Sequence, residues 1–238
     1  MDTLPLEELY LLLEQHGDNG YSFQMCPPPL FVEIAKINHL RSRASKASAI
    51  EDDHQKEACE ILQRVYAFSP AAWTEATGPP EDDRTLFFEI MQRAVALFYI
   101  LTLQSVHILP GGSQQSRARD RKRETLYDLL VTAFDSSFSM GMKGYLLWPI
   151  MVLGVAAVHG GAVMRSFIRR SLVDLSVSRG TSSPLVAKQV LETFWASGKT
   201  EWDDCFDAPH LFTAVLTVNR RRTPSPLLGP DAQPQLLK

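Results

Sequence analysis

The 238-residue sequence predicts an all-α fold, a single irregular bundle of about eight to ten helices. Apolar residues recur at three- and four-residue spacing along most of the chain, whereas the strict alternation of a β-strand is almost absent. Short linkers rich in Gly and Pro separate the apolar stretches, as in helices that pack against their sequence neighbours. Hydrophobic residues make up 45% of the chain and charged residues 21%, which is ordinary for a globular domain.

The first half of the chain contains four candidate helices. We expect them over residues 6–15, 30–41, 54–68 and 85–109. The second helix follows the prolines of 27–29, and the turn signal Ser69-Pro70 follows the third. The polar segment 110–120 contains Gly111 and Gly112 and is expected to be a poorly ordered loop.

The second half contains four more candidate helices, over residues 123–138, 145–158, 164–175 and 184–195. The last is the most clearly bounded, with Ser183 as N-cap, Pro184 at the first helical position and Gly198 as terminator. Its apolar stripe comprises Val186, Val190, Leu191, Phe194 and Trp195. In the helix before it, we expect solvent-facing positions for Arg165, Arg169, Arg170 and Asp174.

Residues 1–212 are expected to form one helical domain, and residues 213–238 a disordered tail rich in Arg and Pro. The longest wholly apolar runs, Ala94–Leu101 and Tyr145–Val158, are shorter than the roughly 18 to 20 residues of a membrane-spanning helix. We therefore expect core helices and no membrane partner. The acidic N-terminus, Met1–Glu8, differs from a basic signal or transit peptide, which favours the cell interior.

No catalytic, cofactor-binding or metal-ligating residue is nominated, because no motif has the spacing that its chemistry requires. Gly198-Lys199-Thr200 lacks the upstream glycine of a phosphate-binding loop and follows a helix instead of preceding one. Asp203, Asp204 and Asp207 are interrupted by Cys205 and Phe206, which indicates a capped helix start more than a cation site. The six histidines show no metal-binding spacing.

Cys26, Cys59 and Cys205 are expected to be reduced and mostly buried, with Cys59 on the apolar side of its helix. We interpret Trp148, Phe194, Trp195 and Trp202 as core residues. The alternative is a ligand cavity lined by Trp148, Phe98 and Trp195.

Two basic runs, 117–123 and 220–222, are interpreted as solvated charge, with nuclear localisation or phosphate contact as the alternative. The second run precedes Thr223-Pro224 and Ser225-Pro226, which would suit proline-directed phosphorylation.

The order of features from Tyr145 to Phe212 resembles the C-terminal part of the fungal-specific transcription factor domain. These features are Leu146-Leu147-Trp148-Pro149, the arginine-containing helix 165–175, Ser183-Pro184, Phe194-Trp195 and Trp202-Asp203 with Phe206. Looser likeness reaches back to about residue 20, through Cys26-Pro27, the helix from Leu30 to Leu40, and Ile61-Leu62 before Ser69-Pro70. This domain is the helical regulatory part of fungal zinc-cluster regulators.

The resemblance implies a regulator of transcription, not an enzyme, that acts in the nucleus through protein partners or self-association. In that family a six-cysteine cluster with two zinc ions reads DNA, and three scattered cysteines cannot supply it. We therefore expect indirect DNA contact, in a fragment, a truncated gene model or a regulator without its own DNA-binding module. The resemblance also allows a small-molecule effector. Two alternatives stay open, a small-molecule-sensing helical domain and an uncharacterised helical enzyme.

Overall fold

The computed structural model describes residues 26–47, 50–78, 82–135, 138 and 140–206, and helices are the only regular elements in those ranges. The α-helices are α2 (Pro28–Lys46), α3 (Asp52–Ala67), α4 (Pro70–Thr77), α5 (Asp82–Ser105), α6 (Ser113–Asp135), α7 (Met140–Lys143), α8 (Leu147–Ala156), α9 (Ala162–Arg179), α10 (Ser183–Ser197) and α11 (Trp202–Cys205). Two 3-10 helices, η1 (Gly144–Leu146) and η2 (Ala157–His159), flank α8. The prediction of an all-α fold is confirmed. The expected helix 6–15, Asp207 and the tail 213–238 with its basic run 220–222 lie outside the described residues.

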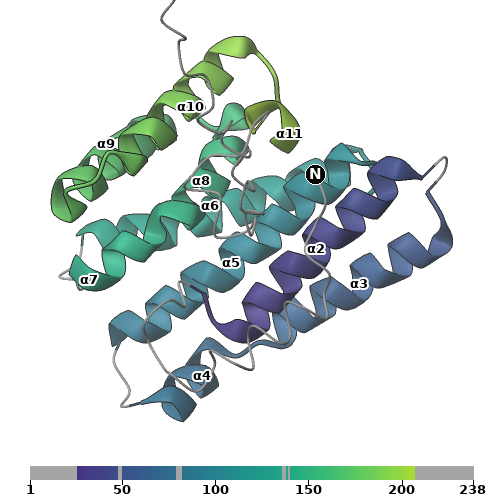
Figure 1. The fold of residues 1–238 in the computed structure, drawn as a ribbon, viewed down its shortest axis with the longest axis horizontal. Coiled ribbons are helices and arrows are strands. Elements are labelled where there is room, and N and C mark those ends of the chain that lie inside the picture. Colours follow the sequence, from purple (N-terminus) through teal and green to yellow (C-terminus); the bar gives the residue numbers. More distant parts are fainter. Residues whose placement is uncertain (1–25, 48–49, 79–81, 136–137, 139, 207–238) are drawn as a thin grey trace, which may run out of the picture.

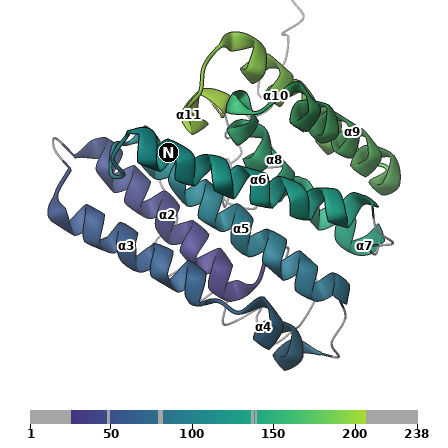
Figure 2. The same cartoon turned by 180° about the vertical axis from the view of Figure 1, so that it is seen from behind.

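Helix α5 forms the centre of the bundle and contacts α2, α3, α4, α6, α8 and α11. In both views α3, α2, α5 and α6 follow one another across the molecule, and α9 and α10 lie on the side away from α3 (Figures 1 and 2). Every residue of α5 from Ala94 to Leu103 is buried. A helix that is apolar all round is stable in water only when neighbours cover all its faces, which is the position that α5 occupies.

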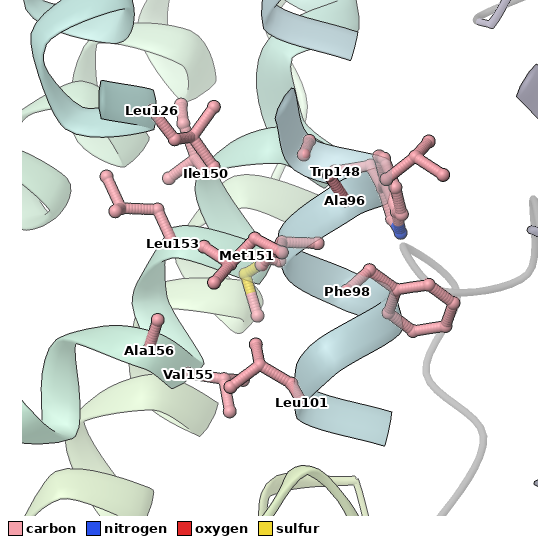
Figure 3. Packing of buried hydrophobic residues seen from close by; sticks show 14 of the residues in the cluster. Ala96, Phe98, Leu101, Leu126, Trp148, Ile150, Met151, Leu153, Val155 and Ala156 are labelled. Carbon is pink, nitrogen blue, oxygen red and sulfur yellow. The ribbon is translucent and has the colours of Figure 1, made fainter. Parts of the chain in front are cut away.

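Helix α8 is the second fully enclosed element, and every residue from Trp148 to Ala156 is buried. Figure 3 shows Met151 and Val155 of this helix beside α5, with Ile150 close to Leu126 of α6. Two segments, Asp83–Ser105 and Gly141–His159, are long and apolar enough to span a membrane, with mean hydropathies of 1.6 and 1.5. However, 78% and 61% of their apolar windows are buried inside the fold, as in core helices of a helical bundle.

The start of α6 corrects the expected loop 110–120, because the helix begins at Ser113, ten residues before the predicted Arg123. The polar first turns of α6 carry no apolar stripe, so periodicity could not reveal them. Gln, Arg and Ala nevertheless favour helices intrinsically, and Gly112 marks the break before them.

Helix α4 was not predicted, since Ser69-Pro70 was interpreted only as a turn. In the structure Ser69 is the N-cap, and its hydroxyl accepts a hydrogen bond from the backbone N–H of Ala72 at 3.3 Å. Pro70 occupies the start of the helix, where its missing N–H costs no hydrogen bond. Ser69-Pro70 therefore marks the start of a helix and not only a turn.

Helix α10 starts one residue earlier than expected, with Ser182 as N-cap and Ser183 inside the helix. Its predicted end is confirmed, because Gly198 adopts a left-handed conformation with φ of 74°. Val186 was placed on the apolar stripe but is 45% exposed. The buried position is Ala187, which lies four residues before the buried Leu191 and therefore on the same face of the helix.

Two of the three cysteines follow the prediction. Cys26 and Cys205 are buried, whereas Cys59 is exposed, so its assignment to the core is wrong. The neighbouring Ala58 is fully buried, and consecutive positions of a helix differ by about 100° in direction, which turns Cys59 away from the core.

Candidate functional site

A chain of aromatic rings lies where α5, α8 and α11 meet. Phe98 packs edge-on against Trp148, with ring centroids 5.7 Å apart, and against Trp202 at 4.9 Å. Trp202 also contacts Phe206 at 4.7 Å. The rings of Phe98 and Trp148 lie beside each other (Figure 3) and thus fill the space that a cavity between them would need. The four predicted core residues, Trp148, Phe194, Trp195 and Trp202, are all buried.

Trp195 of α10 contacts both α8 and α9, at a site separate from the aromatic chain. Its indole Nε1 donates a hydrogen bond to the carbonyl oxygen of Gly154 in α8 at 2.8 Å. The guanidinium groups of Arg165 and Arg169 in α9 lie over the ring, 5.4 and 5.1 Å from its centroid. The expectation that these two arginines face only solvent is therefore wrong, because a tryptophan ring attracts a cation placed over its face. Arg170 is exposed, as predicted.

The acidic cluster after α10 serves the fold. Asp203 pairs with Arg41 of α2. Asp204 pairs with Lys199 at 3.3 Å and accepts a hydrogen bond from the backbone N–H of Glu201 at 3.3 Å. This is the capped helix start that the sequence indicates, and each carboxylate already has a cationic partner. The Gly-Lys-Thr segment lies after the C-terminal end of α10, where a helix offers carbonyl oxygens and no free N–H groups to a phosphate.

The basic run at the start of α6 is partly used inside the fold. Arg123 is buried and donates to the carboxylates of Asp120 and Glu124, at 2.8 Å each. The ammonium of Lys122 lies 4.6 Å from the ring centroid of Tyr66, and burial lowers its pKa. Arg123 is thus paired inside the fold and is not solvated as expected, whereas Arg117 and Arg121 are exposed.

Metal ligation finds no support in the described part of the chain, where no three His, Cys, Asp or Glu side chains come together. His54 instead accepts a hydrogen bond from the backbone N–H of Glu51 at 3.1 Å, which stabilises the start of α3. Burial raises the pKa of the Cys26 thiol, so that this cysteine stays protonated and unreactive.

A surface feature that the sequence did not reveal lies between α6 and α9. It is an open hollow of about 370 Å³, lined by Tyr127, Ala162, Val163, Ser166, Phe167 and Arg170. The rings of Tyr127 and Phe167 meet edge to face at 5.3 Å. Val163, which lines the hollow, is 74% exposed, and Val177, further along α9, is 80% exposed. The signal was present in the sequence as valines on the polar side of a helix.

The described residues form a helical domain in which no catalytic or metal-binding site is found. Comparison of its sequence with known families identifies the domain. The chain belongs to the fungal specific transcription factor domain family, whose model matches residues 4–213. This is a family of transcription factor domains and not of enzymes. The resemblance stated from the motifs is thereby confirmed over nearly the whole chain.

A curated relative is the phomenoic acid biosynthesis cluster-specific transcriptional regulator of Leptosphaeria maculans. The two sequences are 40% identical over 212 residues, which cover 87% of this chain and 40% of the regulator. The chain thus spans less than half the length of that relative. No solved structure matches the chain significantly.

Proposed function

We propose that this chain is the regulatory domain of a nuclear regulator that controls a cluster of biosynthetic genes. The observation that carries the proposal is the 40% identity to a cluster-specific transcriptional regulator over 212 residues. The identity covers almost the whole helical domain, so it reflects a shared regulatory domain and not a short motif. Regulation of transcription requires action in the nucleus.

The domain acts through contact with protein, either another factor or a second copy of itself. Arginines that could meet DNA phosphates are in part engaged inside the fold, as Arg123 and Arg41 are. Sequence-specific DNA binding then belongs to a zinc-cluster module outside this sequence. A small-molecule effector stays a prediction, and the filled space between Phe98 and Trp148 does not favour it.

A reporter experiment tests the regulatory role. The chain is fused to a heterologous DNA-binding module, and transcription is measured from a promoter that carries the operator of that module. We expect the fusion to change the transcript level, whereas the chain without the module has no effect. Leu191→Asp places a charge at a fully buried position and should abolish the effect by unfolding the domain. A nuclear, folded fusion that leaves transcription unchanged would contradict the proposal.

A binding measurement tests the statement about DNA. The purified chain alone should bind DNA weakly, without sequence preference, and release it as salt is raised. Tight, sequence-specific binding by this chain would show that a separate DNA-binding module is not required.

A further inference from the structure

Helix α9 buries one face and leaves the opposite face uncovered in the described structure. The buried face carries Met164, Phe167, Ile168, Ser171, Leu172 and Leu175. The opposite face carries three valines, Val163, Val173 and Val177, which are 74%, 39% and 80% exposed. Valine favours strands over helices, so its repeated use on the outer side of a helix has no explanation in helix propensity.

Two opposite charges lie on the same outer face, one helical turn apart. Arg170 and Asp174 are both exposed, and no ion pair involving either of them is found among the described residues. Because their signs are opposite, a second α9 packed antiparallel can place its Asp174 against Arg170 and its Arg170 against Asp174. A twofold axis then gives two equivalent ion pairs from a single pair of residues.

The same pairing brings the valines into register. When Arg170 faces the partner's Asp174, the twofold axis passes α9 level with Leu172. Val173 then lies within about 3 Å, along the helix, of the partner's Val173, from the rise of 1.5 Å per residue. Val177 lies level with the partner's Phe167, at the hollow between α6 and α9. Val177, the most exposed valine of α9, therefore meets this hollow on the partner.

We propose that the outer face of α9 is a self-association surface on which two copies of the domain pack antiparallel. Arg170 pairs with the partner's Asp174, the two Val173 side chains meet at the axis, and Val177 enters the hollow lined by Tyr127, Ser166 and Phe167. The inference deepens the proposed function, since it names a second copy as the protein contact. Charge complementarity and the match between protruding valine and hollow both favour a second copy over an unrelated partner.

The size of this face sets the expected affinity. Helix α9 has 18 residues and is about 27 Å long, at 1.5 Å per residue. A strip of that length and about 10 Å wide buries less than the roughly 800 Å² per partner of a standard interface. We therefore expect a weak dimer that forms only at high protein concentration.

Sedimentation equilibrium of the 238-residue chain, from about 1 to 200 µM, tests the charge pairing. Arg170→Asp or Asp174→Arg alone sets like charges against each other and should weaken the dimer about tenfold or more. The double variant R170D/D174R exchanges the charges and should restore dimerisation. Both side chains are exposed, so the fold is retained, and circular dichroism checks it.

Two valines give a matched pair for the apolar contact. Val177→Glu should prevent dimerisation, because it places a carboxylate in the hollow. Val186→Glu makes the same substitution at a 45% exposed valine of α10 and should leave the dimer intact.

Cross-linking tests the register. In a Cys59→Ser background, which removes the exposed native thiol, Val173→Cys should be joined rapidly by a short bismaleimide. Val163→Cys is more exposed, but its two copies lie about 27 Å apart along the helices, so it should not react across the pair.

Three results would overturn the inference: a monomer at every concentration, a double charge exchange that fails to restore the dimer, or equal cross-linking at positions 163 and 173. These failures are separable from failure of the proposed function. If the chain is monomeric and still changes reporter transcription, the α9 proposal is wrong and the proposed regulatory function stands. If the chain dimerises but reporter transcription does not change, the proposed regulatory function is wrong and the α9 surface stands.

Discussion

Gly154 lies where α8 closely approaches a buried side chain of α10. In the interior of a helix, Gly→Ala normally stabilises a protein by about 0.5 to 1 kcal/mol. A Cβ atom at Gly154 would lie only 2.4 Å from Cδ1 and 2.8 Å from Cδ2 of Leu191. Leu191 is fully buried and has no room to move aside. Such overpacking costs about 1 to 3 kcal/mol, so after the gain in helix propensity Gly154→Ala should lower the free energy of unfolding by up to about 2.5 kcal/mol.

A double-mutant cycle isolates this contact. Leu191→Ala alone should cost about 2 to 5 kcal/mol by leaving a cavity. In that background the methyl group at position 154 meets no leucine, so Gly154→Ala should stabilise the protein by about 0.5 to 1 kcal/mol. Urea unfolding followed by circular dichroism measures all four proteins, with a constant slope as the check on comparable unfolding. A stabilising effect of Gly154→Ala in the otherwise unchanged protein would refute the close approach of α8 and α10.

Three further predictions concern single side chains. Trp195→Phe removes the indole donor to the carbonyl oxygen of Gly154 and should lower the free energy of unfolding by about 1 to 3 kcal/mol, measured by urea unfolding. In the folded protein at mildly alkaline pH, a thiol reagent should label Cys59 and leave Cys26 unmodified, since burial raises the Cys26 pKa; equal labelling rates would contradict this burial. Burial lowers the pKa of His159, so its contribution to stability is complete above the unfolded-state value and is lost as pH falls through the pKa of the folded state; His159→Gln should reduce this acid sensitivity in unfolding curves.

Periodicity predicted those helices whose apolar stripe faces the core. It located α3, α5, α9 and α10, because positions such as Ile61 and Leu172 recur at helical spacing and are buried as expected. It missed α4 and the first turns of α6, whose residues face solvent and carry no stripe. For these segments only capping residues and intrinsic propensity hold a signal, and Ser69-Pro70 is such a signal.

The arguments against catalytic and metal sites depended on the spacing of residues within short motifs, which can be seen directly in the sequence. Contacts between distant segments could not be predicted in the same way. Asp203 meets Arg41 from 162 positions away, and nothing in either local pattern announces the pair. Arg165 and Arg169 occupy polar positions of an amphipathic helix, so solvent exposure was the natural expectation. Their contact with Trp195 follows from how α9 and α10 are placed, which is a property of the tertiary fold.

Hydropathy and burial together decide where this domain still has apolar surface to cover. By composition α5 and α8 are the most apolar elements, yet their side chains are satisfied within the bundle. Helix α9 is far less apolar, but Val163 and Val177 remain open to solvent, where each costs free energy as long as it stays uncovered. Three of the six exposed large apolar residues in the described part of the chain lie on α9, so this helix, and not the most hydrophobic segments, has the most apolar surface left to cover. A regulatory domain that works by contact should be sought on that outer face, because the core is already complete.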